Sequence, residues 1–336
     1  MAVSSALNNI GNELLSTTMH ILMKEWRDNV SEATAFLDAH ERVHGAGGPT
    51  QAGGTRIVIP LGMGEHSRLQ TGFERIDLSV EDVFEPAVFN WGHVVRPVAI
   101  SSEEEMINSG ESAIISILES RVKMTANALK RQFCQQIVQG SVTGWDDWET
   151  LNGIDVTTGF LEHRADGAQT NTVGGVLKTS FQDKTGWQQG FFDGSASFNA
   201  NGLAGLYDLK VEIASKGGNQ PNVILASREG FKNLKRSLSA QERYVSQDKI
   251  DGGRLVEYWD GIQIDVERFM PNAGTNSTAD PASFMFLNLD DIHMLWDPKG
   301  YFDMSDFETV SGEYDVRSVK IRCRGQLVCR SLAGAG

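Results

Sequence analysis

The segment from Pro86 to Phe133 constrains the fold of this chain most strongly, because it joins an extended stretch directly to a very long helix. Ser101 and Ser102 are good helix N-caps, and each is followed three residues later by a glutamate, which makes a doubled capping box. Apolar residues then recur every three or four positions, and Gly140 can end the helix. A helix over residues 102–138 spans roughly 55 Å, whereas globular helices average about 12 residues. The segment therefore predicts a spine joined to an arm, an architecture suited to reaching other subunits.

A second reaching element is predicted at the amino end. Apolar residues recur at helical spacing from residue 6 to residue 44. The Gly-rich segment 45–54 that follows is typical of a flexible linker. We expect a helical arm on such a tether to have little reason to fold back on its own domain.

Residues 55–100 contain extended, β-branched pieces separated by glycines. Folded as a hairpin with legs of about 20 residues, this segment could project up to roughly 65 Å. Charged residues of both signs along it, with one arm tryptophan, are candidates for contact with a neighbouring subunit: Trp26, Arg56, Arg68, Glu74, Arg75 and Glu81. The alternative for any single charge is a solvated surface position, which is the commoner case.

The segment from 141 to 288 has the pattern of a separate α/β unit. The run NVILA at 222–226 predicts a buried strand, and Ser227 is placed to cap a helix over 228–238. Asp260 and Gly261 form a turn pair that suits a tight hairpin. A further helix over 199–215, strands at 283–287 and 292–296, and anchoring roles for Trp145 and Trp148 in the core or an interface are also expected.

The last strand, from Val319 to Ser331, alternates between an apolar face and a second face. The second face carries four cations in an otherwise acidic chain: Lys320, Arg322, Arg324 and Arg330. These cations could meet acidic residues of a neighbouring subunit, contact nucleic acid, or lie in solvent. The residue pattern leaves these three interpretations open.

Composition indicates a soluble globular protein, since 40% of the 336 residues are hydrophobic and 22% are charged. No apolar run is long enough to cross a bilayer, and the amino end lacks the pattern of a signal peptide. Three cysteines do not make a disulfide framework, so we expect a reduced protein made in the cytosol. The net charge of −14 argues against tight nucleic-acid binding, which requires clustered Lys and Arg.

One enzyme motif is present, the HExxH sequence formed by His40, Glu41 and His44. The third histidine that a metzincin requires is replaced by Thr50, and Gly-rich residues follow the motif at once. Two ligands at a frayed helix end lack the surroundings that hold metal ligands in place. We therefore predict no catalytic, cofactor-binding or metal residue and regard this motif as a decoy.

The order of these elements resembles that of tailed-bacteriophage major capsid proteins with the Hong Kong 97-type fold. The pieces that carry the resemblance are TRIVIPL (55–61), AVFNWGHVVRPVAIS followed by EEEMINSGESAIISILESR, NGIDVTTGF (152–160), TVGGV (172–176), PNVILASREGFKNLKRSL (221–238), GIQIDVE (261–267) and FMFLNLDDIHMLW (284–296). The evidence lies in their order along some 280 residues, because each piece alone is a diffuse pattern.

The resemblance implies an α+β fold with four parts. Residues 1–54 would form an amino-terminal arm, and 55–100 an extended β-hairpin loop. A peripheral domain would comprise 101–150 and 291–336, with the spine helix over about 102–138 and a return strand over about 316–331. Residues 151–290 would form an axial α/β domain.

The resemblance also implies a structural protein rather than an enzyme. Copies of the chain would form hexamers and pentamers in an icosahedral shell around double-stranded DNA, which they would contact weakly and without sequence specificity. The virion would be assembled in the host cytoplasm without a membrane. Expected partners are a separate scaffolding protein, because the arm begins almost at Met1, and a portal. A decoration protein is left open.

Two alternatives to the capsid function remain. An encapsulin-type nanocompartment shares the fold but encloses a cargo enzyme. A zinc-dependent hydrolase acting through the motif at 40–44 is the weaker alternative. The predicted hairpin loop at 55–100 contains no lysine, so we predict no lysine–asparagine cross-linking from it of the kind that some capsid relatives carry out.

Overall fold

In a computed structural model of the chain, the described residues fall into two compact units. The first contains Val94–Gln132 and Lys299–Cys323, and the second contains Ala33–His93, Phe133–Pro298 and Arg324–Gly336. The described residues are 35–45, 48–62, 84–101, 103–104, 117–140, 142–152, 159–162, 169–179, 187–192, 198–216, 219–239, 257–270, 283–305, 308–309 and 316–336.

The first unit is built around strands that pair with β13 (Val316–Cys329). Its partners there are β3 (Gly92–Ser101), β11 (Asp303–Met304) and β12 (Glu308–Thr309). The register places Asp303 opposite Arg322. The predicted return strand over 316–331 is therefore confirmed as an extended element.

The first predicted capping box is also present in this unit. Glu104 N donates to Ser101 Oγ at 3.2 Å, and Ser101 N donates to Glu104 Oε2 at 3.4 Å. The guanidinium of Arg121 binds both oxygens of Glu104, each at 2.8 Å, and this bond holds the pKa of Glu104 below its usual value. Ser102 and residues 105–116 lie outside the described residues, so the predicted spine is seen as α4 (Ile117–Gln139).

Within the second unit, α4 ends as the sequence predicts. Gly140 has a φ of +73°, and its N–H donates to the carbonyl of Gln136 at 2.8 Å. Phe133 lies among Trp145, Trp148 and Trp296, with ring centroids 5.2 to 6.0 Å away. Both Trp145 and Trp148 are buried, which confirms them as core residues.

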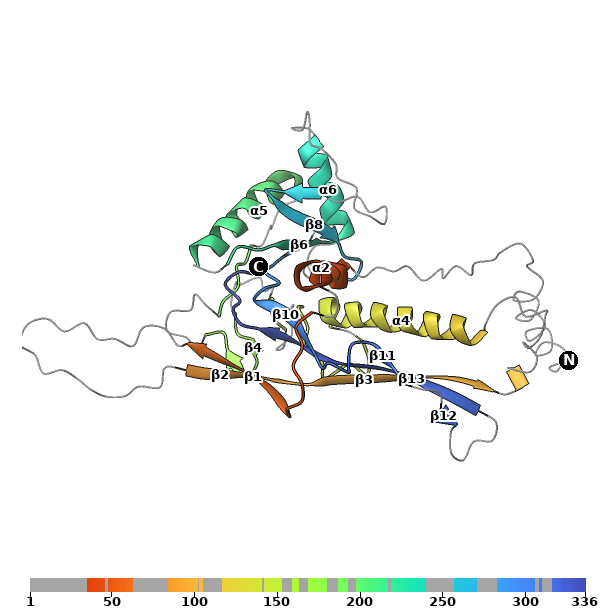
Figure 1. The fold of residues 1–336 in the computed structure, drawn as a ribbon. Coiled ribbons are helices and arrows are strands. Elements are labelled where there is room, and N and C mark those ends of the chain that lie inside the picture. The colour runs from red at the N-terminus through yellow and green to blue at the C-terminus, as the bar shows by residue number, and fades with distance from the viewer. Residues whose placement is uncertain are drawn as a thin grey trace, which may run out of the picture. The chain divides into compact units, whose positions relative to one another are not determined.

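The α/β core of the second unit is a four-stranded sheet in the order β7-β8-β6-β9. Figure 1 labels its two central strands, β8 and β6. The strands are β6 (Val223–Ala226), β7 (Glu257–Trp259), β8 (Ile262–Val266) and β9 (Phe284–Leu287). Only the pair β6–β8 is parallel. Asp260 and Gly261 join β7 to β8 with φ of 51° and 81°, as expected for the predicted tight turn.

Two helices cover this sheet, α5 (Phe198–Ser215) and α6 (Arg228–Ser239). Ile213 and Leu234 from the helices join Ile224 and Phe286 from the strands in one buried cluster. Side chains alternate along a strand, so Val223 and Leu225 of β6 point to the opposite face of the sheet. Both are fully buried, so β6 is covered on its two faces.

The helix α2 (Ala35–His44) packs against this α/β core, which corrects the expectation of an arm held away from its own domain. Phe36 N donates to Glu267 Oε2 at 3.1 Å, and Arg42 binds Asp265 at 2.8 Å. The linker is also held, because Trp296 N donates to Pro49 O and Gln51 N donates to Trp296 O. Residues 1–34 of the predicted arm lie outside the described residues.

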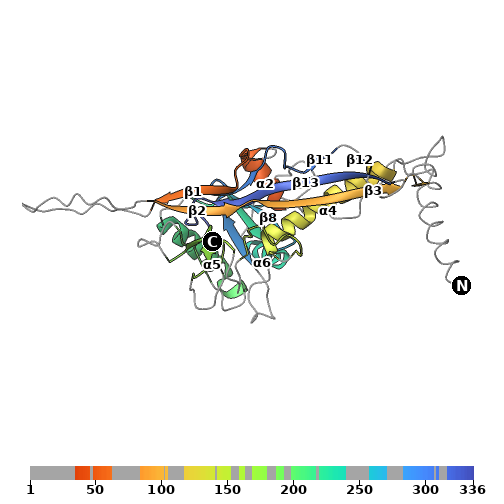
Figure 2. The ribbon, with the colours of Figure 1, turned by 90° about the horizontal axis from the view of Figure 1, so that it is seen from below.

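Two small antiparallel pairs complete the second unit. The strand β1 (Arg56–Gly62) pairs with β2 (Phe84–Asn90), and β4 (Thr172–Val173) pairs with β5 (Val176–Leu177). Figure 2 shows β1 and β2 side by side as a narrow ribbon. The strand β10 (Ile292–Trp296) pairs with residues 325–329. Across the described part of the chain, every helix is too short or too polar to cross a membrane.

Candidate functional site

The HExxH motif lies on α2, and its imidazoles are occupied by protein hydrogen bonds. His40 Nε2 accepts the N–H of Met294 at 3.0 Å, and His44 Nε2 donates to the carbonyl of Leu289 at 2.7 Å. In the described residues, no group of three His, Cys, Asp or Glu side chains is arranged to hold a metal ion. His40 is buried rather than frayed, so the motif is explained by packing.

These two histidines form a cluster with His293, in which His40 and His293 are buried and His44 is half-buried. The His40 and His44 ring centroids lie 4.8 Å apart, and those of His44 and His293 lie 5.6 Å apart. Burial, with smaller effects from neighbouring charges, lowers the pKa of His40 to about 3 and that of His293 to about 4. Both rings are therefore neutral at neutral pH.

The four cations of the last strand do not share one environment. In the first unit, Lys320 is half-buried and Arg322 is exposed. In the second unit, Arg324 binds Asp297 at 3.0 Å and lies over the ring of Trp91 at 5.1 Å, whereas Arg330 is exposed. Arg324 therefore has partners within its own chain.

The predicted alternation of the last strand stops at Gln326 and Val328, which are buried although they belong to the second face. The amide of Gln326 explains this, because it donates to the carbonyls of Asn90 and Asp147. The basic face is therefore not a continuous stripe.

Of the predicted contact residues, only Arg56 is described. It is exposed at the start of β1, opposite Asn90. The others lie outside the described residues: Trp26, Arg68, Glu74, Arg75 and Glu81.

The ribbon of β1 and β2 has an exposed apolar face that these charged candidates did not reveal. Register pairs Val58 with Val88, Pro60 with Pro86, and Gly62 with Phe84 on one side of the ribbon. Val58 is 57% exposed and Phe84 is 69% exposed, although both are large apolar residues. We call Val58, Pro60, Phe84, Pro86 and Val88 the outer ribbon face. Exposed apolar groups of this kind mark interaction sites.

The prolines make this ribbon more suitable for contact through its face than through its edges. Pro60 and Pro86 lie directly opposite each other, and Val88 belongs to the same alternate set of residues. Val88 N donates at 2.8 Å to Gly174 O, outside the ribbon, so N–H groups of this set point away from the partner strand. The prolines therefore remove outward donors from both edges and leave the ladder intact. An edge with fewer outward donors is a poorer template for an added strand.

The opposite face of the ribbon is anchored by a close backbone approach. Ala87 and Phe89 are fully buried there, and Phe89 lies 6.1 Å from Phe160 between ring centroids. Gly174 has a φ of +59°, and an added Cβ would lie 2.9 Å from both Ala87 and Phe89. Only glycine satisfies both the backbone conformation and the space at this turn between β4 and β5.

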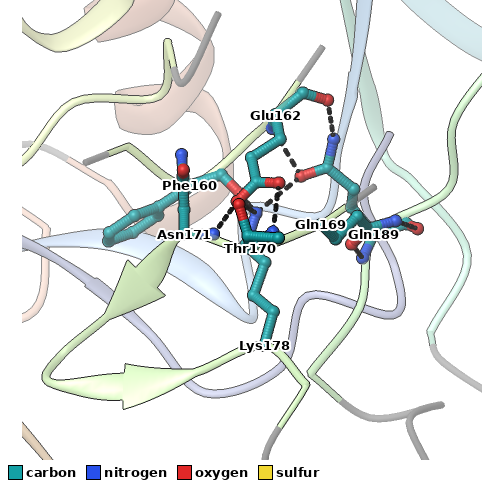
Figure 3. Close-up of polar contacts among 7 residues, drawn as sticks. All are labelled: Phe160, Glu162, Gln169, Thr170, Asn171, Lys178 and Gln189. Atoms are coloured by element: carbon teal, nitrogen blue, oxygen red, sulfur yellow. Dashed lines mark hydrogen bonds and ion pairs between the residues drawn. The ribbon is translucent and has the colours of Figure 1, made fainter. Parts of the chain in front are cut away.

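A buried polar network holds the β4–β5 hairpin in place (Figure 3). Lys178 and Glu162 are 0% and 2% exposed, and their charged atoms lie 3.8 Å apart. Lys178 Nζ donates to the carbonyl of Phe160 at 2.7 Å and to Gln189 Oε1 at 3.0 Å. The carboxylate of Glu162 accepts the backbone N–H groups of Thr170 and Asn171.

Gln189 closes this network from the other side. Its Nε2 donates to the carbonyl of Glu162 at 2.6 Å, and its backbone exchanges two hydrogen bonds with the Gln169 side chain. A buried ion pair is tolerated when its remaining polar atoms are bonded in this way. The network therefore supports the ribbon through the β4–β5 turn.

The sequence patterns predicted neither the outer ribbon face nor the buried polar network around Lys178. The alternation in RIVIPLG and FEPAVFN contained a signal for the outer ribbon face, because both alternate sets of residues in these strands are largely apolar. No local signal could have identified Lys178 as buried, since its partners come from residues 160–162 and 189.

Comparisons with known proteins identify the fold. No protein-family model and no curated protein sequence matches the chain. The structure is similar to the Cyanophage A-1(L) capsid, with a TM-score of 0.61 and 13% identity over 95% of this chain and 96% of that chain. It is also similar to the holo-SrpI encapsulin complex from Synechococcus elongatus PCC 7942, with a TM-score of 0.59 and 10% identity over 96% and 93% of the two chains.

The capsid of an empty GTA particle gives a TM-score of 0.55 and 13% identity over 93% of this chain and 91% of that chain. The three structures agree over nearly the whole length of each protein, which supports a common fold. The chain therefore has the mixed α+β fold of phage capsid and encapsulin proteins, the Hong Kong 97-type fold that its sequence predicts.

Proposed function

We propose that this chain is the major capsid protein of a tailed bacteriophage and assembles with copies of itself into the shell that encloses double-stranded DNA. The observation that carries the proposal is an exposed apolar ribbon face on a chain with this fold. Burial of Phe84 and Val58 would stabilise the protein by removing apolar surface from water, and a neighbouring copy can bury them. This role requires no catalytic residue.

The proposal assigns the domains as the sequence suggested, with an arm over 1–54, a loop over 55–100, a peripheral domain containing α4, and an axial domain over 151–290. The outer ribbon face belongs to the base of the proposed loop. A scaffolding protein, a portal and a decoration protein are its proposed further partners, and the virion, formed in the host cytoplasm, is its proposed location.

The test is electron microscopy and size-exclusion chromatography of the full chain, expressed alone and with a scaffolding protein. We expect closed shells or free hexamers and pentamers. Monomers under every condition would contradict the proposal. Enclosed nucleic acid, measured by absorbance of purified particles, separates a phage head from other shells.

A ribbon variant identifies the contact itself. Val58→Ser combined with Phe84→Ser should leave the unfolding midpoint nearly unchanged and reduce the assembled fraction at least about tenfold, because burial of two large apolar side chains is lost. Met304→Ser is the control, since Met304 is similarly exposed at 53% but lies outside the ribbon. Equal assembly of all three proteins would show that the ribbon face is not a contact.

An encapsulin-type shell is the second candidate, because the similarity to the encapsulin is close to that of the cyanophage capsid, with TM-scores of 0.59 and 0.61. Particles that co-purify with a protein cargo and no nucleic acid would support it. The zinc-hydrolase alternative has no comparable support, since the Nε2 atoms of His40 and His44 are already hydrogen-bonded.

A further inference from the structure

The outward side of α6 is a compact cationic surface in an acidic protein. At about 100° per residue, its four cations fall within a sector of roughly 100°, on the side opposite Gly230 and Leu234. We call Arg228, Lys232, Lys235 and Arg236 the α6 basic face. It extends over about 12 Å, at about 1.5 Å per residue. The chain as a whole has a net charge of −14, so this concentration is a local departure from its overall charge.

The core side of the helix fixes this orientation. Leu234 is fully buried, and Phe231 and Leu238 pack against the same cluster. At the start of the helix, Ser227 Oγ accepts the N–H of Gly230 at 3.1 Å and the N–H of Ser283 at 3.0 Å. The helix is therefore capped and tied to β9, and the basic face cannot turn inward without breaking this core.

Most of the face is accessible to a partner. Arg228, Lys232 and Arg236 are exposed, and Lys235 is half-buried with its Nζ 5.7 Å from the centroid of the Phe231 ring. Among the described residues, the carboxylate of Glu229 lies beside them and accepts a hydrogen bond from Lys232 at 2.9 Å. That bond and the charge of Lys232, with smaller contributions from Arg228 and Arg236, lower the pKa of Glu229. The cations therefore act together on an anion at this surface.

The cations of helix α4, by contrast, are not grouped on one side of the helix. Its four cations are equal in number to those of α6 but spread over about half of the helix circumference at about 100° per residue: Arg121, Lys123, Lys130 and Arg131. Arg121 binds Glu104, and Lys130 lies over the ring of Phe302. Those two cations are held within the chain.

From the composition of the α6 basic face, we infer that it contacts the phosphate backbone of nucleic acid. Protein–protein contacts have an apolar centre and few lysines, whereas nucleic-acid contacts are polar and strongly positive. None of the described side chains of α6 is a large hydrophobic residue in an exposed position. About 12 Å of DNA duplex carries roughly seven phosphate charges, so phosphates are present along the whole length of this face. Because contacts to phosphates do not reach the base edges, this binding is independent of the DNA sequence.

This inference deepens the proposed function, because it names the surface at which a DNA-enclosing shell contacts its contents. The experiment measures binding of the full chain to a short fluorescein-labelled DNA duplex by fluorescence anisotropy, from about 50 to 200 mM salt. Arg228→Gln with Lys232→Gln is the test variant. Lys320→Gln with Arg322→Gln is the control, since it removes the same charge from the basic strand face.

We expect the slope of log affinity against log salt to fall by about 2 for the α6 variant and not to change for the control. Unfolding midpoints establish that both variants are folded, and Lys235→Gln with Arg236→Gln repeats the test on the other half of the face. Absence of salt-dependent binding by the unmodified chain would overturn the inference. A slope change in the control alone would overturn it in favour of the strand.

Assembly is measured on the same samples, so that the two proposals fail separately. Shells that form normally without any DNA binding would contradict the α6 inference and leave the shell proposal standing. Loss of assembly in the α6 variant, with DNA binding unchanged, would show that the face meets carboxylates of a second copy and would also overturn the inference.

Discussion

The outer ribbon face and the α6 basic face are both exposed surfaces of the second unit, but they are built from opposite chemistry. The ribbon exposes Val58 and Phe84 on either side of a pair of prolines, whereas α6 exposes arginine and lysine. Apolar contacts depend weakly on moderate salt, and phosphate contacts depend on it strongly. One unit can therefore carry two kinds of contact, and a change in ionic strength distinguishes them.

The two surfaces also differ in what holds them. Helix α6 rests on an apolar cluster around Leu234, whereas the ribbon rests on a glycine turn supported by the buried pair Lys178 and Glu162. An apolar core tolerates small changes, but a buried charge without its partner is strongly unfavourable. We therefore expect the ribbon to be the more fragile of the two surfaces.

The largest expected effect is from Lys178→Met, which leaves Glu162 buried without its cation. The free energy of unfolding should fall by about 3–5 kcal/mol. Urea unfolding followed by circular dichroism measures this loss. Lys232→Met on α6 is the matched control and should change the midpoint little, because Lys232 is exposed. Adding Glu162→Gln to Lys178→Met should restore part of the loss, and no restoration would contradict the ion-pair explanation.

Acid should lower the free energy of unfolding through the buried histidines near α2. The outer ribbon face and the α6 basic face contain no histidine and should not contribute to this loss. His40 and His293 have folded-state pKa values of about 3 and about 4, below the ordinary 6.5, so the unfolded chain binds more protons in this range. Stability is therefore full above pH 6.5 and declines as the pH falls towards 4.

The expected loss between pH 7 and pH 5 is on the order of 2–4 kcal/mol for the two rings together. Urea midpoints across this range measure it. His293→Gln removes one titrating ring and should flatten the dependence, although Asp290 and Arg330 also act on this position. An unchanged profile in that variant would exclude His293 as a source of the acid sensitivity.

A smaller effect is expected at the turn that anchors the ribbon. Gly174→Ala should lower the free energy of unfolding by about 1–3 kcal/mol, because the residue has a positive φ and its Cβ would meet Ala87 and Phe89. Gly175→Ala is the control, with a φ of +79° and nothing within 4 Å of its added Cβ. Thermal unfolding should rank Gly174→Ala as the more damaging, and the reverse order would refute the close-approach argument.

The smallest effect belongs to the exposed charges of α6. Glu229→Gln removes the carboxylate that binds Lys232 of the basic face, so DNA binding at low salt should tighten by about two- to fivefold. The unfolding midpoint and the assembled fraction should be unchanged. Anisotropy measured with the same labelled duplex tests this, and weaker binding would mean that Glu229 positions the cations instead of opposing them.

Local patterns predicted the elements whose partners lie nearby in the chain. The capping box of Ser101 and Glu104, the Asp260–Gly261 turn and the buried strand β6 follow from neighbouring residues, and all three are present. The helix at 35–44 was predicted as well, but the expectation that residues 35–51 are held away from their own domain was wrong, because their partners are distant in the chain. Phe36 is bonded to Glu267, and Gln51 is bonded to Trp296, which no local spacing could reveal.

By itself, the amino-acid sequence determined the order of helices and strands, the caps and turns that bound them, and the Hong Kong 97-type fold that this order resembles. Only the tertiary structure decided which surfaces remain exposed. It buried Lys178 and His40, gave Arg324 a partner in Asp297, and left Phe84 uncovered. The physical reason is that caps and periodicity act over a few residues, whereas burial depends on every segment that packs against a side chain.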